Sequence, residues 1–560
     1  MRGRAAAGVG EAPDAAPAAA PGPFAPFRHA AFAVLWTATI VSNIGTWMHD
    51  VAAGWLMTSL SPSPLMVALV QTATTLPVFL FSLPAGALAD IVDRRRLLIV
   101  VQSILLVLAG TLGVLVLLGT VSSVMLLGFT FALGTCAAFV APAWQAIVPK
   151  LVDRSALRPA VALNSVGINV SRAIGPALAG LVIAGVGIWA PFFLNTVSYV
   201  GVILALLWWR PPAAPARALP PEHLVGALRA GLRYVRASTP MRATLVRAMA
   251  FFVFASAYWA MLPLIARDLL GGGPTLYGVL LGCVGIGAVS GAMLLPRLNL
   301  LLGPDRLVAA GTLGTAATLV VFALVRDVYI VAAASLLAGT SWIAVLSSLN
   351  VSAQTALPDW VRARGLSVFV TVFFGSMSLG SLVWGQAAAQ FGIPAALLAA
   401  AAGAVLVIPV TFRWKLGQGE GLDLAPSMHW PAPLVAEEVR DDRGPVMVTI
   451  EYRIDPARTA EFVTVMEELA DERRRDGAYA WGLFEDAAEV GRFLEYFLVE
   501  SWAEHLRQHE RVTRSAADVQ AGAREFHIDS AEPVVRHLVA PSRTARGGAG
   551  GRPISVKEVE

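Results

Sequence analysis

The sequence has 560 residues, of which 56% are hydrophobic and only 14% are charged, and its mean hydropathy is +0.66. A soluble globular domain of this length does not have such a composition, so the chain is predicted to be a polytopic membrane protein. The net charge of +4 does not indicate a nucleic-acid partner, because the basic residues lie beside apolar segments, where membrane orientation explains them. Cys136 and Cys283 lie inside apolar segments, which excludes a disulfide framework.

Residues 1–26 are rich in Ala, Pro and Gly and lack the apolar core and cleavage site of a signal peptide. We predict that they form a disordered cytoplasmic tail. Twelve apolar segments follow, each of about 20 residues or more, the length that crosses a bilayer as a helix. The fold class is therefore an all-α polytopic membrane protein whose predicted transmembrane helices cover residues 30–58, 65–89, 97–118, 122–147, 159–185, 189–209, 244–266, 276–296, 307–325, 328–350, 366–388 and 393–412.

Basic residues are distributed unevenly among the loops that join these spans. One set of alternate loops carries nearly all of them, whereas the other set contains only Arg267 and Arg326, each followed by an aspartate. Positive charge marks the cytoplasmic side of a membrane protein. We therefore expect a multi-pass protein of the plasma (inner) membrane, with both termini in the cytoplasm.

The longest loop, residues 210–243, divides the spans into two six-helix halves, residues 27–209 and 244–412. Its apolar residues recur at helical spacing, which predicts an amphipathic helix on the inner membrane face. An internal repeat supports the division, because a set of four residues in the first half recurs in the second half at an offset of 209 residues. These are Gln145, Pro149, Val152 and Leu157 and their counterparts Gln354, Pro358, Val361 and Leu366. Two parallel halves with a central site between them are the arrangement that this repeat predicts.

Polar residues interrupt the first span. Asn43, His49 and Asp50 lie in an otherwise apolar segment, and a carboxylate inside a membrane is costly enough to indicate a function. Asp50 is the first candidate for a proton-binding group, with Asn43 and His49 beside it as proton or substrate candidates. The alternative is that Asp50 lies near the outer end of its helix, where it is hydrated or hydrogen-bonded for structural reasons.

The segment GALADIVDRRR, which begins at Gly86, joins the second and third spans by a short charged turn. Gly86 permits close packing, and Asp90 is placed to pair with Arg94 or Arg95 or to cap a helix. The segment resembles the signature loop of the major facilitator superfamily, except that Asp93 replaces the second glycine of that pattern. The resemblance implies a gate at the inner face. The alternative is that the basic cluster only sets orientation.

The fifth span combines charge with helix-distorting residues. Asn169 and Arg172 precede Gly175, Pro176 and Gly180, so a positive charge lies about one turn from a Gly-Pro pair. Arg172 is a candidate to pair with Asp50 or with an anionic substrate. The sequence GPALAG resembles the fifth-helix motif of superfamily antiporters, with an alanine in place of one glycine. The alternative, that these glycines only allow close helix packing, is equally compatible with the sequence.

Aromatic and amide residues inside the spans are candidates to line a cavity for a bulky ligand, although membrane-interface anchoring and packing are the alternatives for each. They are Trp47, Trp55, Trp144, Tyr258, Trp259, Trp342, Asn350, Gln354 and Trp384.

After residue 412 the composition becomes typical of a soluble protein. A linker is predicted over residues 413–444, a separate domain over 445–540 and a disordered end over 541–560. The domain shows strand and helix patterns in the order β-α-β-β-α-β, which predicts an α+β ferredoxin-like plait. One sheet face is expected to lack a helix cover, and Trp481 and Phe493 are expected to project from it into a possible homodimer interface.

Trp502, His505 and His509 follow one another at helical-turn spacing in the predicted second helix of this domain. The sequence places no carboxylate or cysteine at a spacing that completes a metal site, so a surface or dimer-interface role is expected for them. No catalytic residues, no metal and no cofactor are expected in the chain, and no phosphate-binding glycine loop suggests ATP as the energy source.

The pattern from SNIGTWMHDVAAGWL to the charged turn resembles the transmembrane secretion effector branch of the major facilitator superfamily, to which enterobactin exporters are related. The C-terminal domain resembles small dimeric plaits of the antibiotic-biosynthesis monooxygenase type. The first resemblance implies secondary active export of a small siderophore-, drug- or metabolite-like molecule, with proton antiport and alternating access. The alternatives are an importer or lipid flippase on the same scaffold, and a sensor or enzyme that acts through the C-terminal domain.

Overall fold

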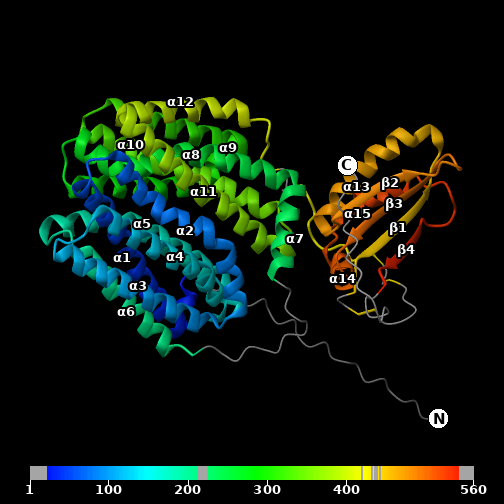
Figure 1. The fold of residues 1–560 in the computed structure, drawn as a ribbon, viewed down its shortest axis with the longest axis horizontal. Helices are drawn as coiled ribbons and strands as arrows, with labels where there is room; N and C mark the ends of the chain where they lie inside the picture. The colour runs from blue at the N-terminus through cyan, green and yellow to red at the C-terminus, as the bar shows by residue number, and fades with distance from the viewer. Residues whose placement is uncertain are drawn as a thin grey trace, which may run out of the picture.

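The computed structural model describes residues 22–210, 224–417, 421–430, 433, 439–440 and 443–541. Figure 1 shows two parts: a bundle of long helices, and a smaller part that contains a β-sheet, which we call the C-terminal region (residues 443–541). Most of the predicted disordered ends, 1–26 and 541–560, lies outside the described residues. Within the described part, a short 3₁₀ helix, Ala25–Arg28, precedes the first long helix.

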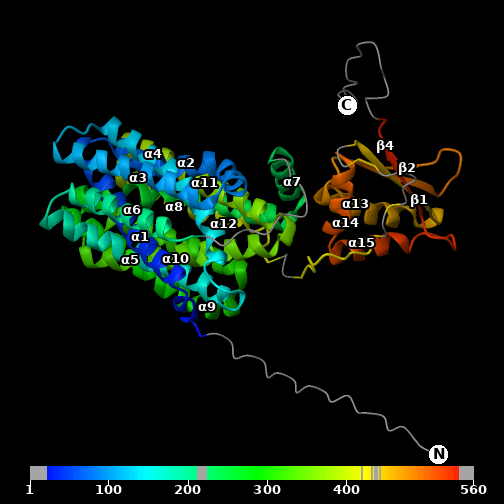
Figure 2. The ribbon, with the colours of Figure 1, turned by 90° about the horizontal axis from the view of Figure 1, so that it is seen from below.

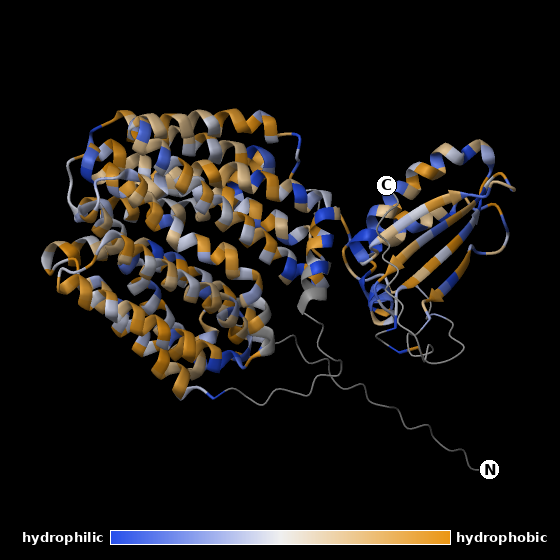
Figure 3. Ribbon diagram, in the orientation of Figure 1, coloured by the Kyte–Doolittle hydropathy of each residue, from blue (hydrophilic) through white to orange (hydrophobic). Residues whose placement is uncertain are grey.

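The bundle contains eleven helices that are long and apolar enough to cross a membrane among the described residues. Most of them coincide with single predicted spans, because long uninterrupted apolar segments leave no alternative to helix in a membrane. Figure 3 shows that hydrophobic residues predominate along them. They are α1 (Ala30–Leu60), α2 (Pro64–Ile91), α3 (Arg94–Leu117), α4 (Ser123–Ile147), α5 (Leu157–Gly185), α6 (Ala190–Trp208), α8 (Thr239–Leu264), α9 (Pro274–Leu324), α10 (Val328–Thr355), α11 (Asp359–Phe391) and α12 (Ile393–Thr411).

Helix α9 accounts for the difference between eleven helices and the twelve predicted spans. It is 51 residues long and contains both predicted segments, 276–296 and 307–325. Gly303 interrupts its helical geometry, with φ of 70° and ψ of 168°, so two helices are joined there without an intervening loop. Glycine adopts this left-handed backbone at little cost. Outside the bundle helices, α7 (Leu224–Ala237) is the short helix predicted within the long loop.

Glycines set the distances between several helices. Helix α5 packs on α9, α2 packs on α11, and α9 packs on α10. A Cβ atom at Gly180 of α5 would lie 2.9 Å from the backbone oxygen of Pro274, and one at Gly278 of α9 would lie 3.1 Å from Gly180 Cα. Both contacts lie where α5 ends and α9 begins. The backbones therefore approach closely at that end of the bundle, as small residues allow in membranes.

The C-terminal region contains a four-stranded antiparallel sheet in the order β2-β3-β1-β4. The predicted second helix is two helices in the structure, because Val512 is non-helical and Thr513 caps a new helix by accepting a hydrogen bond from Ala516 N at 3.2 Å. The elements are β1 (Val446–Arg453), α13 (Thr459–Asp476), β2 (Ala480–Glu485), β3 (Arg492–Val499), α14 (Trp502–Arg511), α15 (Arg514–Arg524) and β4 (Val534–Val539).

The helices cover one face of this sheet, and the prediction for the open face was wrong. Phe493 is 4% exposed and its ring lies 5.4 Å from that of Phe462 on α13, while Trp481 donates a hydrogen bond to the buried Glu495. Both residues therefore point toward the helices. The open face instead carries Phe484 and Tyr496, whose rings stack at 5.7 Å.

Candidate functional site

The first and fifth helices lie side by side, and their contact positions the candidate residues. Trp36 Nε1 donates a hydrogen bond to Leu163 O at 3.2 Å, which fixes the register of α1 along α5. Three turns further along α5, a Cβ atom at Gly175 would lie 2.5 Å from Trp47 Cβ. The antiporter-like glycines therefore do have a packing role. Gly175 admits Trp47 of α1, and Gly180 admits the start of α9.

Arg172 lies on α5, near both α1 and α8. Its guanidinium carbon is 5.6 Å from the centroid of the Trp47 ring, which is within cation–π range. Its Nε atom is buried without a hydrogen-bond partner among the described residues. Tyr258 of α8 is within electrostatic range of the guanidinium. No ion pair joins Arg172 to Asp50 in the part of the chain described, so the expected pairing is absent from this conformation.

The three polar residues of the first span lie on two faces of α1. Asn43 and Asp50 are seven residues apart and share a face with Trp47, because side chains two helical turns apart align. His49 lies on the adjacent face; it is 3% exposed, and its ring meets that of Phe192 on α6 edge-on at 4.7 Å. Neither ring nitrogen of His49 has a partner among the described residues.

Asp50 is partly accessible and lies in the part of α1 that is close to α9. It is within electrostatic range of Tyr199 of α6 and Tyr277 of α9. A Cβ atom at Gly54, one turn beyond Asp50 on α1, would lie 3.2 Å from the Tyr277 hydroxyl oxygen. Asn169, the remaining candidate, lies on α5 and donates to Ser165 O at 2.9 Å.

An aromatic cluster formed by α8, α10 and α11 includes Tyr258. Trp259 of α8 and Trp342 of α10 have ring centroids 5.3 Å apart, and Phe252 contacts both Trp342, at 5.3 Å, and Phe373 of α11, at 4.4 Å. The Tyr258 hydroxyl and the indole nitrogens of Trp259 and Trp342 are buried without partners among the described residues. Sequence reasoning named these aromatic residues separately, but could not show that Tyr258 lies near Arg172 or that Trp259 and Trp342 pack together.

The charged turn that begins at Gly86 is only partly described. The side chain of Asp90 lies outside the described residues, so its expected pairing stays a prediction. Asp93 caps α3 by accepting from Arg96 N at 2.8 Å, which explains an aspartate where the superfamily pattern has glycine. Arg94 begins α3, and Arg95 donates to two backbone oxygens at the end of α6, at 2.7 and 2.8 Å.

The sequence did not predict an ion pair that joins α8 to α9. Arg247 of α8 is 3% exposed and forms an ion pair with Asp305 of α9, two residues beyond Gly303. Asp305 also accepts from Leu416 N at 3.1 Å, where the chain leaves the bundle. The two residues lie 58 positions apart on different helices, so no spacing along the chain indicates that they pair.

Solved structures with this arrangement of helices are membrane transporters. The nucleoside transporter NupG superposes with a TM-score of 0.59 at 10% identity, over 69% of this chain and 99% of that chain. A bacterial homologue of the human lysosomal transporter Spinster, in an inward-facing and unoccupied conformation, superposes with a TM-score of 0.54 at 15% identity, over 70% and 97%. The bundle therefore has the same fold as these transporters.

The chain belongs to the transmembrane secretion effector family, whose sequence profile matches residues 21–545. It is 25% identical over 360 residues to the staphyloferrin A transporter of Staphylococcus aureus, covering 62% of this chain and 87% of the relative. It is 25% identical over 390 residues to the enterobactin exporter EntS of Escherichia coli, covering 68% and 91%. The multidrug efflux pump Tap of Mycolicibacterium fortuitum is 25% identical over 374 residues, covering 65% and 90%. The family and these relatives are transporters and not enzymes.

Proposed function

We propose that the protein is a secondary active exporter of a small molecule, driven by proton antiport through alternating access. The proposal takes α9 as two spans, which gives twelve crossings in two six-helix halves with both termini in the cytoplasm. Names of the relatives, which include an enterobactin exporter and a multidrug efflux pump, support export. The Asp50 carboxylate on α1 supports proton coupling, because a membrane-embedded acidic group is the usual carrier of a coupled proton. An importer or a lipid flippase is the alternative on the same scaffold.

The observation that carries this proposal is the set of unpaired donors on Arg172 and on the aromatic cluster, whose Tyr258 lies near the guanidinium. Arg172, Tyr258, Trp259 and Trp342 each bury a donor without a partner among the described residues. A buried donor without a hydrogen bond costs about 1–3 kcal/mol, more when it is charged, so such a set persists where a ligand supplies the acceptors. We infer a substrate with anionic or carbonyl oxygens and an aromatic or apolar body that fits against the indole rings.

The close helix contacts support a conformation that is closed on the predicted outer side. They gather where α5 ends and α9 begins. A Cβ atom at Gly385, near the end of α11, would likewise lie 3.5 Å from Leu65 Cα at the start of α2. In the proposed cycle these contacts open while the charged turns at Gly86 and Asp305 close the inner face. Replacing Asp90 with asparagine is then expected to slow transport without affecting insertion. Unchanged transport by that variant contradicts a gating role.

For the C-terminal region we propose a ferredoxin-like plait that forms a homodimer through its open sheet face, as the monooxygenase-type resemblance implies. Phe484, Leu494 and Leu538 are 60%, 38% and 48% exposed on that face. Exposed apolar patches of this kind mark association surfaces. Sedimentation of the full chain in detergent tests it: Phe484→Lys is expected to convert a dimer into a monomer. A monomeric wild-type protein removes this proposal and leaves export untouched.

Substitution of Asp50 by asparagine tests proton coupling. The change keeps the size of the side chain and removes its titration, so uphill efflux from energised vesicles is expected to fall by about tenfold or more, equivalent to at least about 1.4 kcal/mol. Downhill exchange of substrate is expected to persist. Asp268→Asn is the matched control, because Asp268 is half exposed beside Arg267 at the end of α8. Full uphill, uncoupler-sensitive efflux by Asp50→Asn contradicts the assignment.

A further inference from the structure

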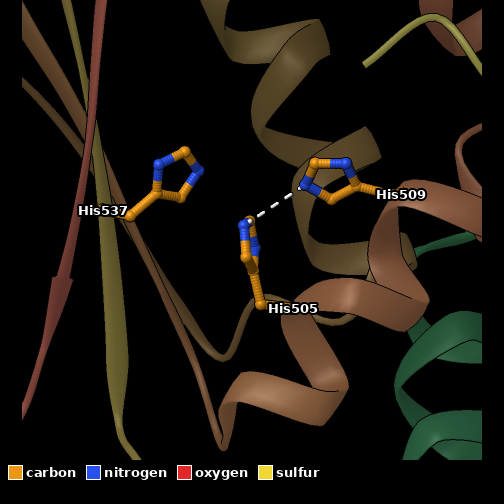
Figure 4. Close-up of side chains that lie close together, drawn as sticks. All are labelled: His505, His509 and His537. Atoms are coloured by element: carbon orange, nitrogen blue, oxygen red, sulfur yellow. Dashed lines mark hydrogen bonds between the residues drawn. The ribbon is translucent and has the colours of Figure 1, made fainter. Parts of the chain in front are cut away.

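Three histidines meet at one place in the C-terminal region, away from the transport site. His505 and His509 lie one turn apart on α14, and His537 comes from β4 (Figure 4). One ring nitrogen from each lies within 4.8 Å of the others. His537 pairs with Val448 across β1 and β4, and Val448 is buried on the helix-covered face, so strand alternation directs His537 toward α14.

We propose that His505, His509 and His537 bind one divalent transition-metal ion, with Zn²⁺ as the reference ion, through their ring nitrogens. The spacing of the rings supports this assignment. Tetrahedral zinc with Zn–N bonds of about 2.0–2.1 Å places its nitrogen ligands about 3.4 Å apart. The Nε2 atoms of His505 and His509 are 3.3 Å apart. The nitrogen of His537 lies within 4.8 Å of the other two, so it has to move closer by up to about 1.4 Å (4.8 − 3.4) to complete the third bond.

The protonation state of the rings suits metal binding. Burial lowers the pKa of His505 to about 3 and that of His509 to about 4, and it also lowers the pKa of His537. All three imidazoles are therefore neutral near pH 7, and a neutral imidazole is the form that coordinates a metal. No proton has to be displaced by the ion from a charged ring. His505 is 1% exposed, and its Nδ1 has no partner among the described residues.

The surroundings of the cluster resemble the outer shell of a metal site. The Trp502 ring lies 5.5 Å from His505 and 6.3 Å from His537, and the Trp430 ring lies 4.9 Å from His509, so apolar rings enclose the cluster. Gln508, on the same helix, is fully buried, and its amide lies within hydrogen-bonding range of His505. Such a group fits a hydrogen bond to a ligand ring or to a metal-bound water.

A histidine–histidine hydrogen bond is the simpler explanation for part of this arrangement. It accounts for the contact between His505 and His509, in which one Nε2–H donates to the other Nε2. It does not account for the third ring, which another element brings to the same place. The described residues add no fourth histidine, cysteine or carboxylate to the group. A fourth coordination position is therefore left for water or an exchangeable ligand.

Three imidazoles without a carboxylate define the class of ion. Such a set favours Zn²⁺, Ni²⁺ or Cu²⁺ over the hard cations Mg²⁺ and Ca²⁺, which prefer oxygen ligands. Sequence reasoning missed the site because the third ligand lies 28 residues beyond His509, on a strand whose register is set only by folding (537 − 509 = 28).

A metal titration of the full-length protein tests this proposal. The protein is purified in detergent without a polyhistidine tag, stripped with a chelator and titrated with Zn²⁺ against a chromophoric competitor, with Mg²⁺ as the negative ion. We expect one Zn²⁺ per chain, and visible absorption bands of four-coordinate Co²⁺ when cobalt replaces zinc. His537→Gln and His509→Gln are each expected to weaken Zn²⁺ binding by about a hundredfold or more, since even outer-shell changes cost 10–100-fold.

His527→Gln is the matched control. His527 lies in the same region and accepts a hydrogen bond from Arg453 N at 2.9 Å through Nδ1, which a glutamine oxygen can replace. It is expected to bind Zn²⁺ as the wild type does. The absence of saturable Zn²⁺ binding by the wild type overturns the proposal, as does wild-type affinity in both ligand variants. The wild-type titration alone decides whether the chain binds Zn²⁺, so the proposal can still be refuted if a variant fails to fold. The outcome is independent of whether the protein exports a substrate.

Discussion

Two buried arginines, Arg473 in the C-terminal region and Arg172 in the bundle, differ in how they are paired. In the C-terminal region, Arg473 and Glu495 are 3% and 0% exposed and form an ion pair at 2.9 Å, and two further side chains donate to the same carboxylate at 3.1 Å. In the bundle, the Nε atom of Arg172 and both ring nitrogens of His49 are buried without partners among the described residues. An unpaired buried polar group lowers stability, so Arg172 is the better candidate of the two arginines for a functional role.

The largest expected effect comes from breaking the paired network. Glu495→Gln removes the charge that compensates Arg473, and loss of one partner of a buried ion pair costs about 3–5 kcal/mol. We expect the C-terminal region of the full chain to unfold at much lower urea concentration, measured by limited proteolysis within residues 443–541. Glu461→Gln is the control, because its pair with Arg458 is exposed and contributes at most about 1 kcal/mol. Equal stability losses in the two variants contradict the comparison.

The opposite pattern is expected for Arg172. Arg172→Met removes a cation whose Nε has no partner in this conformation, so the thermal stability of the bundle should not fall. If Arg172 pairs with the substrate, affinity should fall by about a hundredfold, because loss of a charge-assisted contact costs about 2–5 kcal/mol. Substrate binding and melting are measured on the same detergent-solubilised protein. A variant that melts earlier but binds normally shows that Arg172 is structural. Arg267→Met, at a half-exposed position, controls for loss of charge.

A smaller effect, of about 2 kcal/mol, is expected from Asp476, where the pairing in the C-terminal region is incomplete. Burial raises the pKa of Asp476 to about 6, although Arg475, Arg473 and Arg511 oppose the shift. A carboxyl group with a raised pKa binds its proton more tightly in the folded state, so stability is highest below about pH 4 and is lost as pH rises through 6. Asp476→Asn should therefore stabilise the region at pH 8 and have little effect near pH 4. Urea unfolding at both pH values measures this, and an unchanged pH dependence contradicts it.

The sequence was sufficient where one physical requirement dominates. Long apolar segments must be helical in a membrane, and the alternating pattern of Val446, Val448 and Ile450 correctly predicted the buried face of β1. The sequence was not sufficient where either face of a strand could point toward the core without changing the pattern. β3 reads RFLEYFLV and is apolar on both faces, so alternation could not show that Phe493, and not Leu494, faces the helices.

Contacts between distant residues were the other limit. The unpaired donors come from α5, α8 and α10, and no spacing along the chain reports that Tyr258 lies near Arg172. Gly303 shows the same limit for the backbone, because a glycine between two apolar segments predicts a break but not that the two helices continue without a loop. Register and packing, which decide these features, depend on the whole fold.

The attachment of the C-terminal region to the bundle has a mechanical consequence. Figures 1 and 2 show α7 between the two parts. Arg233 of α7 pairs with Glu500 at 3.9 Å, Tyr234 of α7 donates to Ala356 O at 3.2 Å, and the Arg511 guanidinium of α14 lies 4.4 Å from the Trp360 ring at the start of α11. These contacts attach the region to one side of the bundle, the side formed by the later helices. In a rocking motion of two halves it would act as a lever arm, and its far edge would sweep a longer arc than any residue in the membrane. Spectroscopic labels there would magnify the transport cycle into displacements that are easy to measure.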